Sequence, residues 1–205
     1  MRGFYFITDA GSSRAGNISD VKNALKAGVR IVQYRQKNKS SREMFEEALK
    51  LRRICKDIIF LVNDRIDLAL AVGASGVHLG QDDLPVAVAR RLLGKKKIIG
   101  VTAHNLKEAL LAQKQGADYL GISPIFSTKT KSDAGKPIGI PALKKIRARV
   151  IIPIISLGGI NLKNAKSVIQ AGSDGICAIL AVVSKDDVCR EIRSFKKIFL
   201  REPKS

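Results

Sequence analysis

The stretch KIIGVTAHNLKEALLAQKQGADYLGIS, residues 97–123, contains one complete strand–helix–strand unit. Its two ends, residues 97–103 and 118–123, are apolar and rich in β-branched or aromatic residues, which is typical of buried strands. Between them, Asn105 is a candidate N-cap for a helix, and Gly116 is a candidate glycine stop directly before the second strand. The stretch therefore predicts a helix that connects two parallel strands.

The same unit recurs along the whole chain. Strands are predicted over residues 4–9, 29–35, 58–64, 76–80, 97–103, 118–123, 152–159 and 174–180. Helices are predicted over residues 18–27, 41–55, 85–93 and 162–171, in a short segment that ends at Gly73, after Asn105, and from Pro141 and Ser184 onward. Eight such units predict one α/β domain, residues 1–205, with the (β/α)8 TIM-barrel fold. An open doubly wound sheet is the alternative, but its Gly-x-Gly-x-x-Gly loop is missing after the first strand.

Length and composition fit one domain, since the chain has 205 residues and 45% of them are hydrophobic. The three cysteines, Cys55, Cys177 and Cys189, are odd in number and lack the spacing of a metal site. We expect no signal peptide, because a predicted strand begins almost at once, and no membrane span, because no apolar run is long enough. We therefore expect a cytoplasmic protein with free thiols and no membrane partner.

The formal net charge of +19 predicts attraction to polyanions. However, the basic residues are spread from Arg2 to Lys204 among acidic ones, with no long Lys/Arg block and no row of aromatic residues for base stacking. We therefore expect phosphate-bearing small molecules as partners and regard nucleic acid as an unlikely main one. The sequence leaves the oligomeric state open, with a homo-oligomer among the possible states.

Polar or glycine residues follow six of the predicted strands, where a barrel enzyme places its chemistry. The cations Arg35, Lys37 and Lys131 could converge on phosphate oxygens. Asp64 and Asp83 follow neighbouring strands, and carboxylates beside a phosphate are the usual ligands of Mg²⁺. The pattern predicts a diphosphate that is held with the help of a metal ion. A reaction in which this diphosphate leaves needs no protein nucleophile.

A second phosphate could bind the backbone N–H groups of Gly158 and Gly159. Simpler interpretations remain open beside the functional ones. The two glycines could form a tight turn, and Asp64 could cap the next helix. His78 is expected to be an inward, hydrogen-bonded barrel residue, and His104 to order a loop.

Several segments resemble the thiamine-phosphate synthase family, and the resemblance covers nearly the whole chain. They are residues 33–37 (QYRQK), 63–74 (NDRIDLALAVGA), 76–85 (GVHLGQDDLP), 116–121 (GADYLG), 124–131 (PIFSTKTK), 158–160 (GGI) and 171–175 (AGSDG). The Asn-Asp, Gly-Gln-x-Asp and Thr-x-Thr-Lys segments are specific in combination. The family condenses 4-amino-2-methyl-5-hydroxymethylpyrimidine diphosphate with 4-methyl-5-(2-hydroxyethyl)thiazole phosphate by a dissociative substitution, which yields thiamine phosphate and diphosphate.

The resemblance implies a role for each matching residue. Gln33, Arg35, Lys37 and Asn63 would bind the pyrimidine diphosphate, Asp64 and Asp83 would ligate Mg²⁺, and Thr128, Thr130 and Gly159 would bind the thiazole phosphate together with the backbone of Ile179 and Leu180. Arg35, Thr102 and Lys131 would be catalytic, because they would contact the diphosphate as it leaves. Residues 127–138 would form a lid that excludes water.

Two residues depart from the family pattern. Thr102 stands where the family usually has serine, and both side chains carry a hydroxyl. Leu180 follows Ile179 where the family usually has serine, so one hydroxyl donor to the thiazole phosphate is lost. Two alternatives therefore stay open. The first is the sister family of thiazole-phosphate tautomerases, which has a histidine near the position of Ser123 and Pro124. The second is a non-catalytic sensor of a phosphate-bearing ligand.

Overall fold

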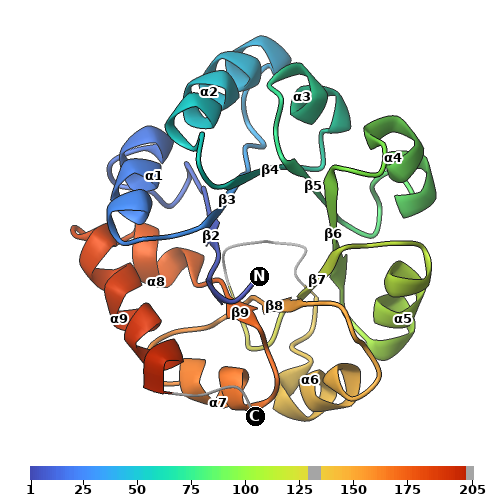
Figure 1. Ribbon diagram of the computed structural model, residues 1–205. Coiled ribbons are helices and arrows are strands. Elements are labelled where there is room, and N and C mark those ends of the chain that lie inside the picture. The colour runs from blue at the N-terminus through green and yellow to red at the C-terminus, as the bar shows by residue number, and fades with distance from the viewer. Residues whose placement is uncertain (129–134, 202–205) are drawn as a thin grey trace.

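The computed structural model describes residues 1–128 and 135–201, which form a ring of parallel strands surrounded by helices (Figure 1). The strands are β1 (Gly3–Phe4), β2 (Phe6–Ile7), β3 (Ile31–Tyr34), β4 (Ile59–Asn63), β5 (Gly76–Leu79), β6 (Ile98–Ala103), β7 (Tyr119–Ile122), β8 (Ile154–Ser156) and β9 (Gly175–Ile176). Each strand from β3 to β8 pairs in parallel with the next along the chain. The predicted TIM barrel is confirmed.

The first predicted strand closes the ring by pairing on both sides. Its initial part, β1, pairs with β9, and its second part, β2, pairs with β3. Tyr5 lies between the two parts and donates its backbone N–H to the carbonyl of Ile176 at 2.9 Å. Because one short segment bridges both edges, the barrel has no free edge strand among the described residues.

The helices lie outside the strands, one after most of them (Figure 1). They are α1 (Asn17–Lys26), α2 (Ser41–Ile54), α3 (Ile66–Ala71), α4 (Val86–Leu93), α5 (Leu106–Lys114), α6 (Gly139–Arg147), α7 (Ala165–Gln170), α8 (Ile179–Val183) and α9 (Val188–Arg201). The predicted N-cap is confirmed, since the Asn105 side chain accepts the backbone N–H of Glu108 at 2.9 Å. The predicted glycine stop is also confirmed, because Gly116 has a φ of 90°.

The strand predicted over residues 174–180 is wrong in its second half. The strand β9 ends at Ile176, and Ile179 and Leu180 instead begin the short helix α8. The sequence Ile179–Val183 is a short apolar run, and periodicity cannot distinguish a buried strand from a buried helix over so few residues. The last helix also begins at Val188, later than the predicted Ser184.

Apolar side chains fill two layers. One cluster lies between the strands and the helices, and a second cluster, which includes Tyr5, Leu61, Tyr119 and Ile155, fills the inside of the barrel. This division follows from the alternation of side chains along each strand. The aromatic ring of Tyr119 fits inside because position 100 is glycine: a Cβ there would lie 2.0 Å from the ring.

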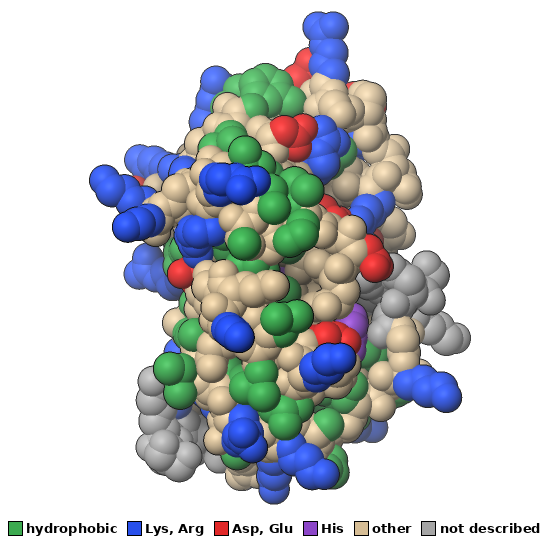
Figure 2. Space-filling view, turned by 90° about the vertical axis from the view of Figure 1, so that its right-hand side faces the viewer, with side chains coloured by type: hydrophobic (Ala, Val, Ile, Leu, Met, Phe, Trp, Pro, Cys, Tyr) green, Lys and Arg blue, Asp and Glu red, His purple; other side chains and the backbone are tan. Residues whose placement is uncertain are grey.

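The surface carries many basic side chains. Figure 2 shows Lys and Arg scattered over one face between hydrophobic and neutral side chains, and those described residues do not form one continuous basic patch there. Among the described residues, no helix combines the length and the apolar character that crossing a membrane requires.

Candidate functional site

A cavity of about 410 Å³ opens where the strands end. Eight of the residues predicted to bind substrate line it: Gln33, Arg35, Asn63, Thr102, Thr128, Gly159, Ile179 and Leu180. They belong to strand ends and to the segments that follow different strands, because the carboxyl ends of parallel barrel strands meet on one face. The structure thus brings together residues that are up to 147 positions apart, from Gln33 to Leu180.

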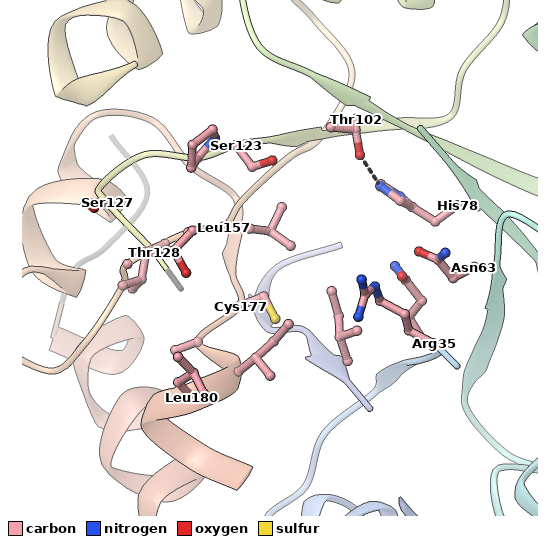
Figure 3. A pocket seen from close by; sticks show the side chains of 18 residues that line it. Arg35, Asn63, His78, Thr102, Ser123, Ser127, Thr128, Leu157, Cys177 and Leu180 are labelled. Carbon is pink, nitrogen blue, oxygen red and sulfur yellow. Dashed lines mark hydrogen bonds between the residues drawn. The ribbon is translucent and has the colours of Figure 1, made fainter. Parts of the chain in front are cut away.

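The cavity has a polar side and an apolar side. Figure 3 shows Arg35, Asn63, His78 and Thr102 on one side, supplied by the segments from β3 to β6. On the other side lie the apolar Leu157, Cys177 and Leu180, which follow β8 and β9. The hydroxyl side chains of Ser123, Ser127 and Thr128, from the loop after β7, lie on that side too. Such a cavity suits a ligand with one charged end and one apolar ring system.

Arg35 follows β3 and is held through its backbone. The hydroxyl of Thr8 accepts the Arg35 N–H at 2.8 Å and donates to the Arg35 carbonyl at 3.1 Å. Its guanidinium forms no ion pair with any carboxylate that the structure describes, and the side chain points into the cavity (Figure 3). Arg35 can therefore offer its fork of N–H donors to an anionic ligand.

The two predicted metal ligands, Asp64 and Asp83, lie beside the cavity and do not line it. Burial raises the pKa of the Asp83 carboxyl, the backbone N–H of Gly80 opposes this, and the neighbouring Asp64 raises the pKa further. The predicted phosphate ligand Lys37 also lies here, with its Nζ 2.5 Å from Asp64 Oδ2. The structure therefore places two carboxylates and one ammonium group together at the rim.

Asp64 is held in an unusual backbone conformation. Its φ is 61°, a left-handed value that no other non-glycine residue adopts in the described part of the chain. Its N–H donates to the His78 carbonyl at 2.8 Å, which ties the end of β4 to β5. The proposed role of Asp64 as a helix cap is wrong, because α3 has Arg65 at its N-cap position and lacks a side-chain cap.

The pair of carboxylates fits a hard divalent cation. In residues 1–128 and 135–201 no cluster of three or more His, Cys, Asp or Glu side chains forms a closed metal cage. Mg²⁺ does not need one, because it keeps several waters and binds through one or two carboxylates plus phosphate oxygens. The mutual repulsion that raises the pKa of Asp83 is also what a bound cation relieves.

Both histidines are placed as the sequence predicts. His78 is buried inside the barrel and hydrogen-bonded to Thr102, with its Nε2 2.9 Å from Thr102 Oγ1 (Figure 3). His104 orders a loop, with its Nδ1 2.6 Å from the carbonyl oxygen of Ser123 and its backbone N–H donating to Glu108.

Gly158 and Gly159 form the tight turn after β8, and both also line the cavity. A Cβ at position 158 would lie 2.6 Å from Pro124, and one at position 159 would lie 2.4 Å from the Ser127 carbonyl oxygen. The glycines therefore allow the β8 end and the loop after β7 to approach closely. This packing explains them structurally, and it also leaves their backbone at the cavity surface.

Part of the predicted site falls outside the described residues. Thr130 and Lys131 belong to residues 129–134, so their predicted contacts with phosphate are not described, and the same holds for half of the predicted lid. Conversely, the prediction missed three apolar lining residues of the cavity, Ile7, Leu157 and Cys177. Each follows by two positions a residue of its predicted strand that faces the barrel interior. Because residues two apart share a face, this spacing is the signal that could have identified them.

The chain is similar to known thiamine-phosphate synthases over nearly its whole length. Residues 4–182 match the family model described as thiamine monophosphate synthase. A thiamine-phosphate synthase from Methanosarcina barkeri is 52% identical over 203 residues, covering 98% of this chain and 92% of that protein. One from Chloroflexus aurantiacus is 52% identical over 197 residues, covering 95% and 91%. The solved thiamine phosphate pyrophosphorylase of Pyrococcus furiosus is 41% identical with a TM-score of 0.90, covering 97% of this chain and 96% of that one.

Proposed function

The chain belongs to the thiamine monophosphate synthase family, and on that premise we propose that it is a transferase that makes thiamine phosphate. Its substrates would be 4-amino-2-methyl-5-hydroxymethylpyrimidine diphosphate and 4-methyl-5-(2-hydroxyethyl)thiazole phosphate. The observation that carries the proposal is the cavity where eight separately predicted binding residues meet. Its polar side suits the pyrimidine diphosphate, and its opposite side, with Leu157, Cys177 and Leu180, suits the thiazole ring.

The polar side would bind the pyrimidine diphosphate. The carboxamides of Gln33 and Asn63 can hydrogen-bond the ring nitrogens and the amino group. The guanidinium of Arg35 can form two parallel hydrogen bonds with diphosphate oxygens, and Thr102 can donate its hydroxyl to another. Lys37, at the adjacent rim, and Lys131 would add positive charge to the same group.

In the proposed reaction, the bond between the pyrimidine methylene carbon and the diphosphate oxygen breaks, and its electron pair leaves with diphosphate. The thiazole nitrogen then gives its lone pair to the methylene carbon, which forms the new C–N bond. Arg35, Lys37 and Thr102 stabilise the negative charge that develops on the leaving oxygen. Leu157, Cys177 and Leu180 exclude water from the cationic carbon, so that thiazole captures it instead.

Asp64 and Asp83 would hold Mg²⁺ at the rim, where the ion would neutralise part of the diphosphate charge. For the carboxylate of Asp64 to be available, Lys37 must leave it and turn toward the substrate. The thiazole phosphate would bind on the opposite side, near Thr128, Gly159 and the backbone of Ile179. The free thiols of the chain suit a reducing compartment, so we also place the reaction in the cytoplasm.

The test is turnover of the purified protein with both substrates, with Mg²⁺ and with EDTA, followed by chromatography of thiamine phosphate. We expect product that requires the metal, and we expect Arg35→Gln to lower kcat/KM by about a hundredfold, because it removes a charge-assisted contact to the leaving group. Arg14→Gln is the matched control, since Arg14 is exposed, pairs with Asp186 and does not line the cavity. If both substrates bind but no thiamine phosphate forms, the proposal is wrong.

The tautomerase alternative lacks its histidine at the expected position, although His78 of β5 does line the cavity. Ser123, which stands near the position of that family's histidine, lines the cavity and offers a hydroxyl in place of an imidazole. Incubation with the thiazole phosphate alone distinguishes the two activities, because only a tautomerase would move its double bond.

A further inference from the structure

A chain of hydrogen bonds crosses the interior of the barrel below the cavity. Gln33 Nε2 donates to the hydroxyl of Tyr5 at 2.8 Å, and that hydroxyl lies 2.7 Å from the hydroxyl of Tyr119. The Tyr119 hydroxyl lies 2.8 Å from His78 Nδ1, and His78 Nε2 lies 2.9 Å from Thr102 Oγ1. The two ends of the chain, Gln33 and Thr102, both line the cavity.

The middle of this chain is isolated from solvent. Tyr5 and Tyr119 are 2% and 0% exposed, and burial raises the pKa of both hydroxyls, so that both keep their protons. The barrel also leaves room for the chain at two positions without a Cβ. A Cβ at Gly100 would collide with the Tyr119 ring, and one at Gly121 would lie 2.8 Å from His78 Cε1.

The hydrogen bond from Gln33 determines the direction of the whole chain. Because the Tyr5 oxygen accepts the amide N–H, its own proton is directed to Tyr119. Tyr119 then donates to His78 Nδ1, which leaves the single ring proton on Nε2, where it is donated to Thr102. The Thr102 oxygen accepts that bond, and its proton remains available to the cavity.

The opposite direction would leave a buried proton unpaired. If His78 donated from Nδ1, Tyr119 would donate to Tyr5, and the Tyr5 oxygen would accept from both neighbours. Within the described part of the chain, the Tyr5 hydroxyl has hydrogen-bond partners only in Gln33 and Tyr119. Its own proton would then have no acceptor in a fully buried place, which is strongly unfavourable.

We infer that Tyr5, Tyr119 and His78 are positioning residues that fix which hydrogen-bonding groups the cavity presents to its ligand. The inference rests on the proposed function. The chain directs the Thr102 proton toward the diphosphate oxygen, which becomes more negative as the C–O bond breaks. At the other end it turns the Gln33 carboxamide oxygen toward the cavity, where it accepts an N–H of the aminopyrimidine. One buried chain thus orients a donor for the leaving group and an acceptor for the ring.

The direction can be measured without turnover, by the tautomer of His78. The protein has only two histidines, so ¹⁵N-labelled imidazole signals can be assigned by comparison with a His104→Asn variant. Two-bond ¹H–¹⁵N correlation spectra of the full-length protein should show His78 as a neutral ring protonated on Nε2. A ring protonated on Nδ1, or on both nitrogens at neutral pH, would overturn the inference.

Two variants test the two ends of the chain separately. Tyr119→Phe removes the donor to His78 Nδ1, so the His78 signals should lose the single tautomer and kcat should fall about tenfold, with KM within about twofold. Tyr5→Phe removes the acceptor that holds the Gln33 amide, so KM for the pyrimidine diphosphate should rise about tenfold. A purely structural role would not separate kcat from KM in this way.

Tyr34→Phe is the matched control. Tyr34 is another buried tyrosine, but it lies on the outer side of β3, and its hydroxyl donates to Glu47 at 2.8 Å. Its replacement should lower thermal stability about as much as the other two and leave kcat and KM unchanged. If Tyr119→Phe and Tyr34→Phe have equal kinetics, the inference is wrong. If the wild-type protein makes no thiamine phosphate, the proposed function fails, whereas the His78 tautomer still decides the direction of the chain.

Discussion

Replacing Lys37 with methionine should have opposite effects on the two ligands proposed for the rim. The Lys37 ammonium lies 2.5 Å from Asp64 Oδ2, and Asp64 in turn raises the pKa of Asp83. Lys37 therefore supplies the positive charge that a metal ion would otherwise supply. Without it, the two carboxylates repel each other more strongly, and Mg²⁺ should bind the substrate-free protein more tightly. The pyrimidine diphosphate should bind more weakly, because it loses one cation.

The structure also sets the size of these effects. The Lys37 side chain is 51% exposed and that of Asp64 is 21% exposed, so water screens the ion pair. Such pairs contribute at most about 1 kcal/mol, which corresponds to a roughly fivefold decrease in the Kd of Mg²⁺. A charge-assisted hydrogen bond to a phosphate contributes about 1.5–3 kcal/mol, so the Kd of the diphosphate should increase at least about tenfold.

Calorimetric titration with MgCl₂ at low ionic strength, and then with the pyrimidine diphosphate at saturating Mg²⁺, measures both effects. Lys39→Met is the matched control, because Lys39 pairs with Glu47 at 3.0 Å and its loss lowers the net charge equally. We expect this control to bind both ligands like the wild type. If Lys37→Met binds Mg²⁺ no more tightly than Lys39→Met, the assignment of Asp64 and Asp83 as a carboxylate pair neutralised by Lys37 is refuted.

Three further substitutions have effects of known direction. Asp20→Asn should stabilise the fold at pH 7 by about 1 kcal/mol in thermal unfolding, because Asp20 is 1% exposed and burial raises its pKa, with Ser13 opposing. A raised folded pKa means that the native aspartate loses stability as pH rises through that value, so the advantage of asparagine should disappear near pH 3. Gly121→Ala should lower the free energy of unfolding in urea by about 1–3 kcal/mol, because its Cβ would overlap His78; an unchanged midpoint would contradict the packing described. Leu180→Ser, at the cavity mouth, should lower KM for the thiazole phosphate about threefold through a new hydroxyl donor and leave KM for the pyrimidine diphosphate unchanged; an equal change in both would argue against its placement.

The barrel was predictable because strand and helix signals alternate through the chain. The cap at Asn105 and the stop at Gly116 are local features, determined by residues within a few positions, and both are present. The error at residues 179–180 has a different origin. Whether Ile179–Val183 extends a strand or forms a helix depends on where β9 leaves the ring, and that depends on its pairing with β8 and β1. Such pairing is tertiary information that no window of sequence contains.

The site was predictable to the extent that its residues are polar and lie at strand ends. Arg35, Asn63 and Thr102 were identified in this way, and all three line the cavity. Tyr5 and Tyr119 were not identified, because an aromatic residue within an apolar strand is indistinguishable in the sequence from an ordinary core residue. Their hydroxyls find partners only when the residue between β1 and β2, the strand β7 and the strand β5 face one another across the barrel. The hydrogen-bond chain therefore forms only when the barrel closes, and no short segment of the sequence predicts it.

The proposed reaction needs two environments that differ in their contact with water, and the barrel supplies both. Diphosphate is strongly hydrated, so its binding groups can lie at an exposed rim, where Lys37 and Asp64 already form a screened ion pair. The cationic carbon must instead be kept from water, and the side chains that follow β8 and β9 are apolar. Thr102 lines the polar side of the cavity, and its oxygen is hydrogen-bonded to the buried His78. The Thr102 hydroxyl therefore keeps its orientation while negative charge develops on the leaving diphosphate. Reorienting it would break its hydrogen bond with the buried His78.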